Sequence, residues 1–313
     1  MSIERADVPA GAAATVPLSG TVGLIGLGAM GQPIAANFVA AGQHLLVRDA
    51  DPAVQEQFVA SHPGAAAATD FAGCDVVVLI LPTSDIVDRV VLGADGVLAQ
   101  LKPGTVIIDM GSSIPARTQA LAAAAGERGV DVIDAPVSGG VTRANAADLA
   151  IMVGGDAAVI DTVRPLLAST GSQIMHVGPV GSGHAAKALN NLLSATGLVA
   201  AAEVLLVGRK FGMDAATLLA VLNASSGRNQ ATETKYEKFI LSHTYGSGFG
   251  AALMRKDIGI ALDLARSENV PTLLGDTLGT LWSSAVDGLQ PGADHTEVVR
   301  YLEQVAGVSL TET

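Results

Sequence analysis

Lys187 and Asn191 are the side chains whose types and spacing point most plainly to chemistry. They lie in the segment 181–191, where a glycine-rich turn precedes a long apolar run that predicts a buried helix. Because residues four positions apart share a helical face, the ammonium and the carboxamide are expected to point into the same space. Such a pair can bind a substrate oxygen and exchange a proton with it. The alternative is a structural lysine paired with Glu203 or Asp134, since an unpaired buried charge costs free energy.

A glycine-rich segment near the N-terminus has the spacing of a dinucleotide-binding turn. Its residues are Gly26, Leu27, Gly28, Ala29, Met30 and Gly31, and they follow an apolar run and open an expected helix. In this pattern the first glycine permits a tight turn, the second lets backbone approach a pyrophosphate, and the third allows close helix–strand packing. The free N–H groups at the helix start then bind phosphate. A purely structural glycine turn is the alternative.

Asp49 is the acidic residue expected at the end of the second strand, about 20 residues beyond the glycines. Its carboxylate can accept hydrogen bonds from ribose hydroxyls and would repel a 2′-phosphate, which favours NAD over NADP. Arg48 is the opposing signal, because its guanidinium could bind that phosphate, so NADP stays open. A helix-capping role for Asp49 near Pro52 is the alternative.

Two further segments place polar or small residues at the ends of expected strands. Leu81 and Pro82 lead to Ser84, and Ser113 follows Asp109 by four residues. Ligands of open α/β sheets bind at the carboxyl ends of the strands. These segments are therefore expected to contact the ribose or the nicotinamide amide. Helix capping by Ser84 and Ser113 is the alternative.

Ser138, Gly139 and Gly140 form a turn that suits a carboxylate. Successive backbone N–H groups and one hydroxyl can surround an anion there. Arg143 could add a charge-assisted hydrogen bond. The alternatives are a tight chain connection and a solvated surface arginine.

The elements that must position these residues change in kind part-way along the chain. The expected strands are 21–25, 45–47, 76–81, 105–108, 130–133, 150–153 and 172–176, and the helices between them are 33–41, 52–61, 86–92, 115–128 and 157–167. Continuously apolar strands that alternate with helices predict an α/β domain with a doubly wound, Rossmann-type parallel sheet over residues 21–180.

Beyond residue 180 the strand-like runs stop and helical periodicity continues. The expected helices are 183–209, 214–223, 230–241, 249–267, 271–288 and 295–305. An all-helical domain for substrate binding and oligomerisation is therefore expected over 181–313. Its boundary with the first domain, in the segment 178–183, would place Lys187 at a domain junction, where ligand sites are frequent. Residues 1–20 are expected to form a disordered tail without a signal or transit peptide.

Composition narrows the class of protein. Hydrophobic residues make up 49% of the 313 residues, which is enough for a sizeable core. The formal net charge of −12 argues against nucleic acid and anionic membranes as partners. Gly, Pro, Asn and Ser interrupt the apolar runs, so no membrane span is expected. Cys74 is the only cysteine, which fits a reducing compartment, and a cytoplasmic location is expected.

Four segments together resemble the β-hydroxyacid dehydrogenase family, which includes 3-hydroxyisobutyrate dehydrogenase and tartronate semialdehyde reductase and has a 6-phosphogluconate dehydrogenase-like fold. The segments are 26–31, 134–140, 181–191 and 256–263, and they occur in the family's order. Ala147 departs from the pattern, because the family usually has glycine there.

The resemblance implies a role for each matching position. Lys187 matches the catalytic lysine, Asn191 the substrate-positioning asparagine, Ser138, Gly139 and Gly140 the carboxylate-binding loop, Ser113 a hydroxyl residue near the nicotinamide, and Lys256 a lysine that helps to cover the cofactor. Asn190 and Arg228 are expected to contact substrate. Arg228 or Asn229 is expected to select it, with a structural helix connection as the alternative.

The expected activity is hydride transfer between NAD, or alternatively NADP, and a small anionic β-hydroxyacid or semialdehyde. Lys187 would be the general base in oxidation and the general acid in reduction. No metal is expected. The apolar helical half predicts a homodimer or homotetramer. The alternatives are an NADPH-dependent imine reductase, a class that generally lacks this lysine, and a non-catalytic cofactor-binding protein on the same fold.

Overall fold

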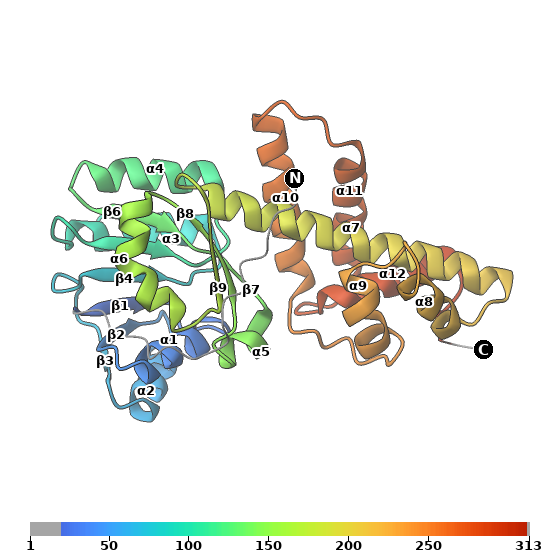
Figure 1. Ribbon diagram of the computed structural model, residues 1–313, viewed down its shortest axis with the longest axis horizontal. Coiled ribbons are helices and arrows are strands. Elements are labelled where there is room, and N and C mark those ends of the chain that lie inside the picture. Colours follow the sequence, from blue (N-terminus) through green and yellow to red (C-terminus); the bar gives the residue numbers. More distant parts are fainter. Residues whose placement is uncertain (1–19, 312–313) are drawn as a thin grey trace, which may run out of the picture.

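The computed structural model describes residues 20–311 of the 313-residue chain. The tail predicted for residues 1–20 therefore lies, apart from Gly20, outside the described residues. Figure 1 shows a part built on a sheet, coloured blue to green, and a helical part, coloured yellow to red, joined along the long helix α7 (Ser182–Phe211). The predicted fold class, a Rossmann-type sheet followed by helices, is confirmed.

A nine-stranded sheet forms the first part. Its spatial order is β3 (Ala65–Ala67), β2 (Leu45–Arg48), β1 (Val22–Ile25), β4 (Val76–Leu79), β5 (Val106–Asp109), β6 (Asp131–Asp134), β8 (Ala150–Gly154) and β7 (Val137–Ser138), with β9 (Gln173–Gly178) paired to β8. Strands β1 to β6 are parallel, as their apolar runs predict. The strand order reverses between β1 and β4, which opens a crevice at their carboxyl ends.

The prediction of a wholly parallel sheet is wrong at β8, which runs antiparallel to β6 and β7. Strand β9 pairs with β8 in parallel and is mostly exposed. The sequence also fails to predict β3 and β7. Strand β3 consists of three alanines, which lack the branched side chains typical of strands, and β7 has only two residues.

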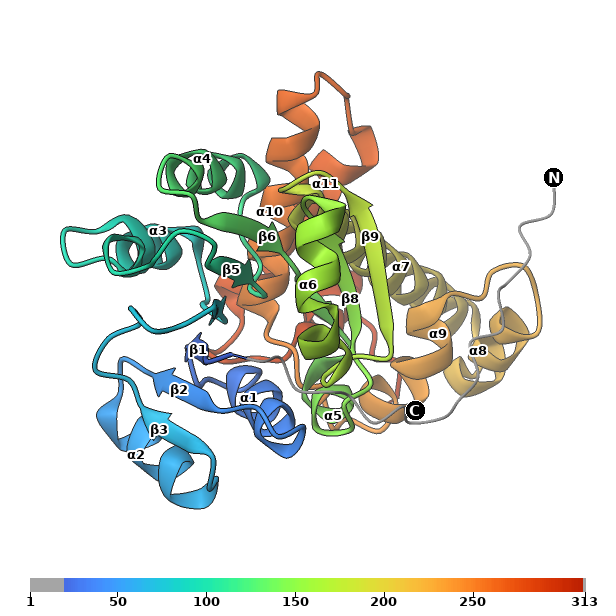
Figure 2. The same ribbon diagram turned by 60° about the vertical axis from the view of Figure 1, so that its left-hand side comes forward.

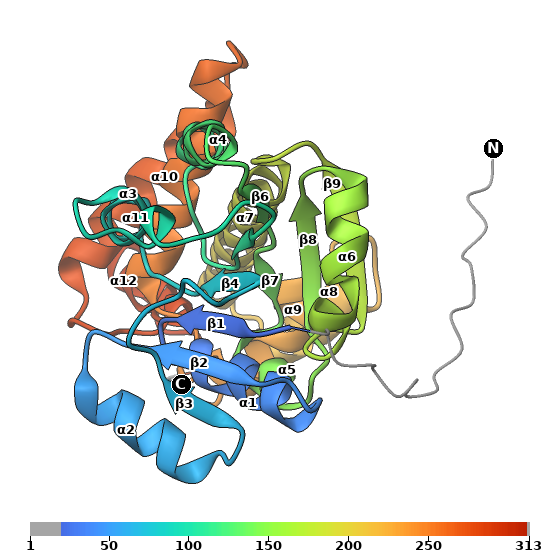
Figure 3. The same cartoon turned by 90° about the vertical axis from the view of Figure 1, so that its left-hand side faces the viewer.

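Helices cover both faces of the sheet, and each face has its own core (Figures 2 and 3). One face carries α1 (Gly31–Ala40), α2 (Pro52–Ser61), α5 (Gly140–Asn145) and α6 (Ala157–Ala168); the other carries α3 (Ser84–Leu92) and α4 (Pro115–Gly126). Along β4, Val76 and Val78 belong to the first core, whereas Val77 and Leu79 belong to the second. Burial on both faces explains why the strand is apolar throughout.

The second part is helical from Ser182 to the end of the described residues. After α7 come α8 (Ala215–Asn223), α9 (Gln230–Thr234), the π-helical turn η2 (Tyr236–Ile240), α10 (Ala251–Ser267), α11 (Leu273–Gly288), the short turn η3 (His295–Glu297) and α12 (Val298–Ala306). Two predicted helices are each divided, one at Lys235 and one at Glu297. Trp282 and Tyr236 are fully buried and centre the core of this part.

Helix α7 belongs to both parts of the molecule. Its 30 residues begin after Gly181 and end before Gly212, and both glycines adopt left-handed backbone angles. It spans about 45 Å at 1.5 Å per residue. By length and mean hydropathy (1.6) it could cross a membrane, yet half of that apolar window is buried inside the protein.

Candidate active site

A cavity of about 940 Å³ opens at the carboxyl ends of β1, β4 and β5 and extends to α7 and α10. This is the size and place expected of a cofactor and substrate site in such a fold. It brings together most of the residues that the sequence singles out. Those in its lining are Gly26, Gly28, Ala29, Met30, Gly31, Asp49, Leu81, Pro82, Gly140, Lys187 and Lys256.

The glycine turn fits a pyrophosphate. Gly26 has a φ of +105°, and a Cβ on Gly31 would lie 1.9 Å from the Gly26 carbonyl oxygen, so both positions require glycine. A Cβ on Gly28 would meet nothing within 4 Å, so its backbone faces open cavity. No side chain caps the start of α1, which leaves N–H groups of its first turn for a ligand.

Asp49 lies at the end of β2 with its carboxylate beside the glycine turn. It accepts hydrogen bonds from the backbone N–H of Leu27 (2.6 Å) and of Asp51 (2.9 Å). Leu27 itself is buried and contributes only its backbone. The adjacent Arg48 donates to the Thr69 carbonyl oxygen at 2.8 Å and stacks over the Phe71 ring. The acidic side chain is therefore available to a ribose, while the guanidinium already has partners.

Lys256, on α10, joins the helical part to two loops of the sheet. Its ammonium donates to the carbonyl oxygens of Pro82 (3.0 Å) and Ser112 (2.7 Å). It therefore crosses one side of the cavity, at the position where a lysine over the cofactor is predicted.

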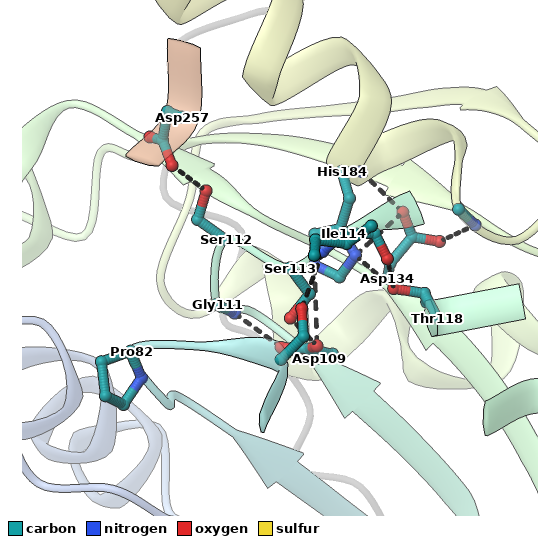
Figure 4. Close-up of polar contacts among 12 residues, drawn as sticks. Pro82, Asp109, Gly111, Ser112, Ser113, Ile114, Thr118, Asp134, His184 and Asp257 are labelled. Atoms are coloured by element: carbon teal, nitrogen blue, oxygen red, sulfur yellow. Dashed lines mark hydrogen bonds and ion pairs between the residues drawn. The ribbon is translucent and has the colours of Figure 1, made fainter. Parts of the chain in front are cut away.

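Ser113 does not line the cavity, so the structure does not bring it together with the other predicted cofactor residues. It is buried, and its hydroxyl donates to Asp109 Oδ2 at 2.7 Å (Figure 4). Its neighbour Ser112 lines the cavity instead and donates to Asp257 Oδ1, also at 2.7 Å. Adjacent serines at the end of a strand point in different directions, and only the structure shows which one faces the ligand.

Asp257 is the functional residue that sequence reasoning misses. Its carboxylate is buried in the junction and accepts hydrogen bonds from Ser112 and, through Oδ2 at 2.6 Å, from Asn191 Nδ2. Its Oδ1 lies 3.5 Å from the Lys256 ammonium. The sequence gives little sign of this role, because α10 carries other charged residues, and only the structure shows that Asp257 is buried while Asp263 lies at the surface.

Lys187 faces this carboxylate across the cavity wall. Its ammonium forms no hydrogen bond or ion pair with any residue from Gly20 to Thr311, so the alternative of pairing with Glu203 or Asp134 does not hold there. Burial lowers the pKa of Lys187; Asp257 opposes this effect and Lys256 adds to it. An amine of lowered pKa that has no partner within residues 20–311 can bind a ligand and exchange a proton with it.

A buried carboxylate fixes the turn that precedes Lys187. Asp134 accepts hydrogen bonds from the backbone N–H groups of Gly181 (2.6 Å) and His184 (2.7 Å), and the His184 ring is hydrogen-bonded to Thr118 (Figure 4). Burial raises the pKa of Asp134, while His184 and the N–H donors pull it down. Asp134 therefore caps the start of α7 and sets the position of the catalytic face.

The predicted carboxylate loop borders the cavity through Gly140. Gly139 (φ +136°) and Gly140 (φ +65°) both hold angles that favour glycine. Ser138 lies in β7, and its hydroxyl has no hydrogen-bond partner among the described residues. Arg143 forms an ion pair with Asp148 at the surface (3.0 Å), as its surface-arginine alternative predicts.

Ala147, where the family usually has glycine, has a φ of +53°. The backbone therefore keeps a left-handed conformation despite a side chain that disfavours it. Alanine in this conformation costs free energy that glycine would not.

The remaining predicted residues lie outside the cavity lining. Asn190 is exposed and donates to Asn191 Oδ1 at 3.1 Å, so it contacts the positioning amide. Arg228 is exposed in the connection between α8 and α9. Asn229 caps α9 and donates to the Gly197 carbonyl oxygen, as its structural alternative predicts.

Comparison with known proteins agrees with this geometry. Residues 21–178 match the family described as the NAD binding domain of 6-phosphogluconate dehydrogenase, and residues 181–302 match the one described as NAD-binding of NADP-dependent 3-hydroxyisobutyrate dehydrogenase. The chain is 38% identical to 2-(hydroxymethyl)glutarate dehydrogenase of Eubacterium barkeri over 93% of its length and 97% of that protein. The chain belongs to the β-hydroxyacid dehydrogenase family.

Other members of the β-hydroxyacid dehydrogenase family are similar along most of the chain. NAD-dependent L-serine dehydrogenase of Pseudomonas aeruginosa is 38% identical over 83% of this chain and 90% of its own. The structure of Mycobacterium tuberculosis 3-hydroxyisobutyrate dehydrogenase with L-serine superposes with a TM-score of 0.83 at 31% identity, over 90% of this chain and 99% of that one. The resemblance inferred from four motifs is confirmed, and the protein is an NAD(P)-dependent dehydrogenase that acts on CH–OH groups.

An imine reductase from Myxococcus stipitatus shares the fold alone, with a TM-score of 0.61 at 19% identity. The activity of that protein therefore carries no weight for this chain.

Proposed function

We propose that this protein oxidises small β-hydroxyacids to semialdehydes with NAD, and that Lys187 is its acid/base residue. The observation that carries the proposal is the Lys187 amine, which has no partner among the described residues and lies in the wall of a cavity whose other end is the dinucleotide turn. A partly buried lysine in that cavity wall, without a partner among the described residues, is available to a bound ligand.

The chain's own residues can carry the proton and hold the acid. When bound, the nicotinamide supplies the hydride acceptor. As the carbinol C–H bond breaks and the carbonyl forms, the hydroxyl proton passes to Lys187 Nζ. The substrate carboxylate lies against Ser138 and the Gly139–Gly140 backbone, where a free hydroxyl and left-handed glycines are available. Asn191 is held by Asp257 and orients the reacting oxygen.

The pKa of Lys187 sets the direction of the pH dependence. Oxidation needs the neutral amine, so kcat/KM for oxidation should rise with pH as Lys187 loses its proton, with an inflection below the usual lysine value because burial lowers its pKa. Reduction needs the ammonium and should fall over the same pH window. Rate profiles measured in both directions check this, and parallel profiles would contradict it.

NAD is the proposed cofactor. Asp49 presents a carboxylate beside the glycine turn, where a 2′-phosphate would be repelled, and Arg48 is engaged by Thr69 and Phe71. Measured kcat/KM should favour NAD over NADP by about tenfold or more, since one unfavourable charge contact costs about 1.4 kcal/mol.

The substrate is best sought among the acids that name the relatives: 3-hydroxyisobutyrate, 2-(hydroxymethyl)glutarate and L-serine. When the protein is mixed with NAD and each acid in turn, NADH formation should raise the absorbance at 340 nm with at least one of them. Tight NADH binding without turnover of any acid or semialdehyde would instead favour a non-catalytic protein on this fold.

A homodimer or homotetramer is also proposed. Leu193 (73% exposed), Val207 (69%) and Phe211 (81%) form an apolar stripe along α7, and Leu273 on α11 is 85% exposed. Light scattering should show more than the monomer mass, and Val207→Glu should reduce it. A cytoplasmic location, without nucleic-acid or membrane partners, remains a proposal on the basis of one cysteine and a net charge of −12.

A further inference from the structure

Lys235 is a second buried lysine that the proposed mechanism does not use. Its side chain is only 9% exposed, and its ammonium donates one hydrogen bond, to Ser194 Oγ at 3.2 Å. No carboxylate oxygen of the described residues lies within 4 Å of it. Burial lowers its pKa to about 8, so most of it remains charged at neutral pH. A buried ammonium with one hydroxyl partner is costly unless an anion comes to it.

Asp294 is the acidic residue that acts electrostatically on Lys235, but its carboxylate is hydrogen-bonded to other groups. Its carboxylate accepts hydrogen bonds from Ser247, from the backbone N–H of Gly248 and Phe249, and from Thr296. It attracts Lys235 from a distance without pairing with it. Gly248 and Phe249 both line the cavity, so the hydrogen bonds of Asp294 are with the cavity wall and not with Lys235.

Lys235 reaches the same helix that carries the proposed catalytic pair. Its partner Ser194 is one turn of α7 beyond Asn191 and two turns beyond Lys187. Residues at these spacings lie on one side of a helix. Along the axis, Ser194 is about 10 Å from Lys187 at 1.5 Å per residue. Ser194 and Lys235 are not in the cavity lining, so a ligand that reaches them has to extend from Lys187 along α7 beyond that lining.

The backbone around Lys235 holds the side chain in this direction. Lys235 is the residue at which α9 gives way to the π-helical turn η2, a kind of irregularity that is frequent at functional sites. On one side Asn229, which caps α9, donates to the Gly197 carbonyl oxygen at 3.3 Å, and on the other the Tyr236 hydroxyl donates to the Leu198 carbonyl oxygen at 2.6 Å. Both anchors tie the segment to α7.

We propose that Lys235 and Ser194 form a distal anion-binding subsite, and that the substrate is a hydroxyacid with a second carboxylate. The proposal rests on the function proposed above and deepens it. The first carboxylate lies at the Ser138 loop, the hydroxyl at Lys187, and a side chain of a few carbon atoms carries the second carboxylate toward Lys235. A monocarboxylic acid would leave the buried ammonium without its counter-ion.

Matched substrates test the subsite. 2-(Hydroxymethyl)glutarate and its distal monoamide have the same length and the same reacting group, and only the first carries the second charge. The wild-type protein should prefer the diacid in kcat/KM by about tenfold to hundredfold, the effect of one charge-assisted hydrogen bond. Lys235→Gln should remove that preference by raising KM for the diacid, with kcat and the kinetics of the monoamide nearly unchanged. Lys238→Gln, an exposed lysine of the same segment, is the matched control.

Equal use of diacid and monoamide by the wild-type protein would overturn the subsite, as would an equal loss on both substrates in Lys235→Gln. A binding measurement separates this from failure of the proposed function. Glutarate, titrated by calorimetry into the NADH-bound protein, should bind the wild type and Lys238→Gln about tenfold or more tightly than Lys235→Gln. Equal binding by all three, or none, would overturn the subsite, whether or not any acid is oxidised.

Discussion

The cofactor end and the substrate end of the cavity are built in different ways. At the cofactor end, the turn from Gly26 to Gly31 is one continuous segment that works through its backbone, with one carboxylate added by Asp49. At the substrate end, side chains come from separate segments: Ser112 after β5, Lys187 and Asn191 on α7, and Asp257 on α10. A local backbone motif suits a dinucleotide, a ligand that many enzymes share. The side chains assembled from separate segments determine which reaction is catalysed.

Replacing Lys187 tests the substrate end with the largest expected effect. Lys187→Met keeps much of the side-chain volume and removes the amine, so kcat should fall by about 10²- to 10⁴-fold, the usual contribution of general acid–base catalysis. Fluorescence titration should give an NADH affinity close to that of the wild type, because the glycine turn is untouched. A kcat within a few fold of the wild-type value would contradict the assignment of proton transfer to Lys187.

Asp257 is the residue that unites the substrate end. Asp257→Ala removes the shared acceptor of Ser112 and Asn191, so the reacting oxygen should lose its orientation and kcat/KM should fall by about 10²-fold. Steady-state kinetics with the best acid substrate measure this. Arg255→Ala is the control. It lies on the same helix as Asp257 and removes only a surface ion pair with Asp287 of α11, so its kinetics should be close to those of the wild type.

Two glycines sharpen the comparison at the cofactor end. Gly28→Ala places a methyl group in open cavity, so the protein should fold normally and bind NADH about tenfold or more weakly. Gly31→Ala directs a Cβ to within 1.9 Å of the Gly26 carbonyl, so thermal stability should also fall. Differential scanning fluorimetry separates the two outcomes, and equal melting temperatures for both variants would contradict the packing role of Gly31.

The smallest expected effect is a change in stability at Ala147, which follows the carboxylate loop 138–140 in the sequence. Ala147→Gly relieves a left-handed alanine and should raise stability by about 1 kcal/mol, measured by denaturant unfolding. Ala146→Gly, at an adjacent position with negative φ, is the control and should be neutral or destabilising. A gain in both variants would mean that the strain at Ala147 is absent.

The difference between a local backbone motif and an assembled set of side chains also explains which features of the fold and site the sequence predicts. The fold class and the glycine turn can be predicted from local patterns. The periodicity of each strand and helix, and the spacing of the three glycines, lie within short continuous segments of the sequence. Asp257 and the choice of Ser112 over Ser113 depend on how α10 docks on the loop after β5, which no local pattern contains. The roles of Arg228 and Asn229 depend on the same kind of docking, because a polar connection gives no sign of whether it faces a ligand or caps the next helix.

Helix α7 has a consequence for how substrate preference can change among related proteins. It carries Lys187 and Asn191, the proposed catalytic pair, on the side that Lys235 reaches from another segment. Substitutions on that opposing segment can alter the length or charge of the accepted acid while the helix and its chemistry stay as they are.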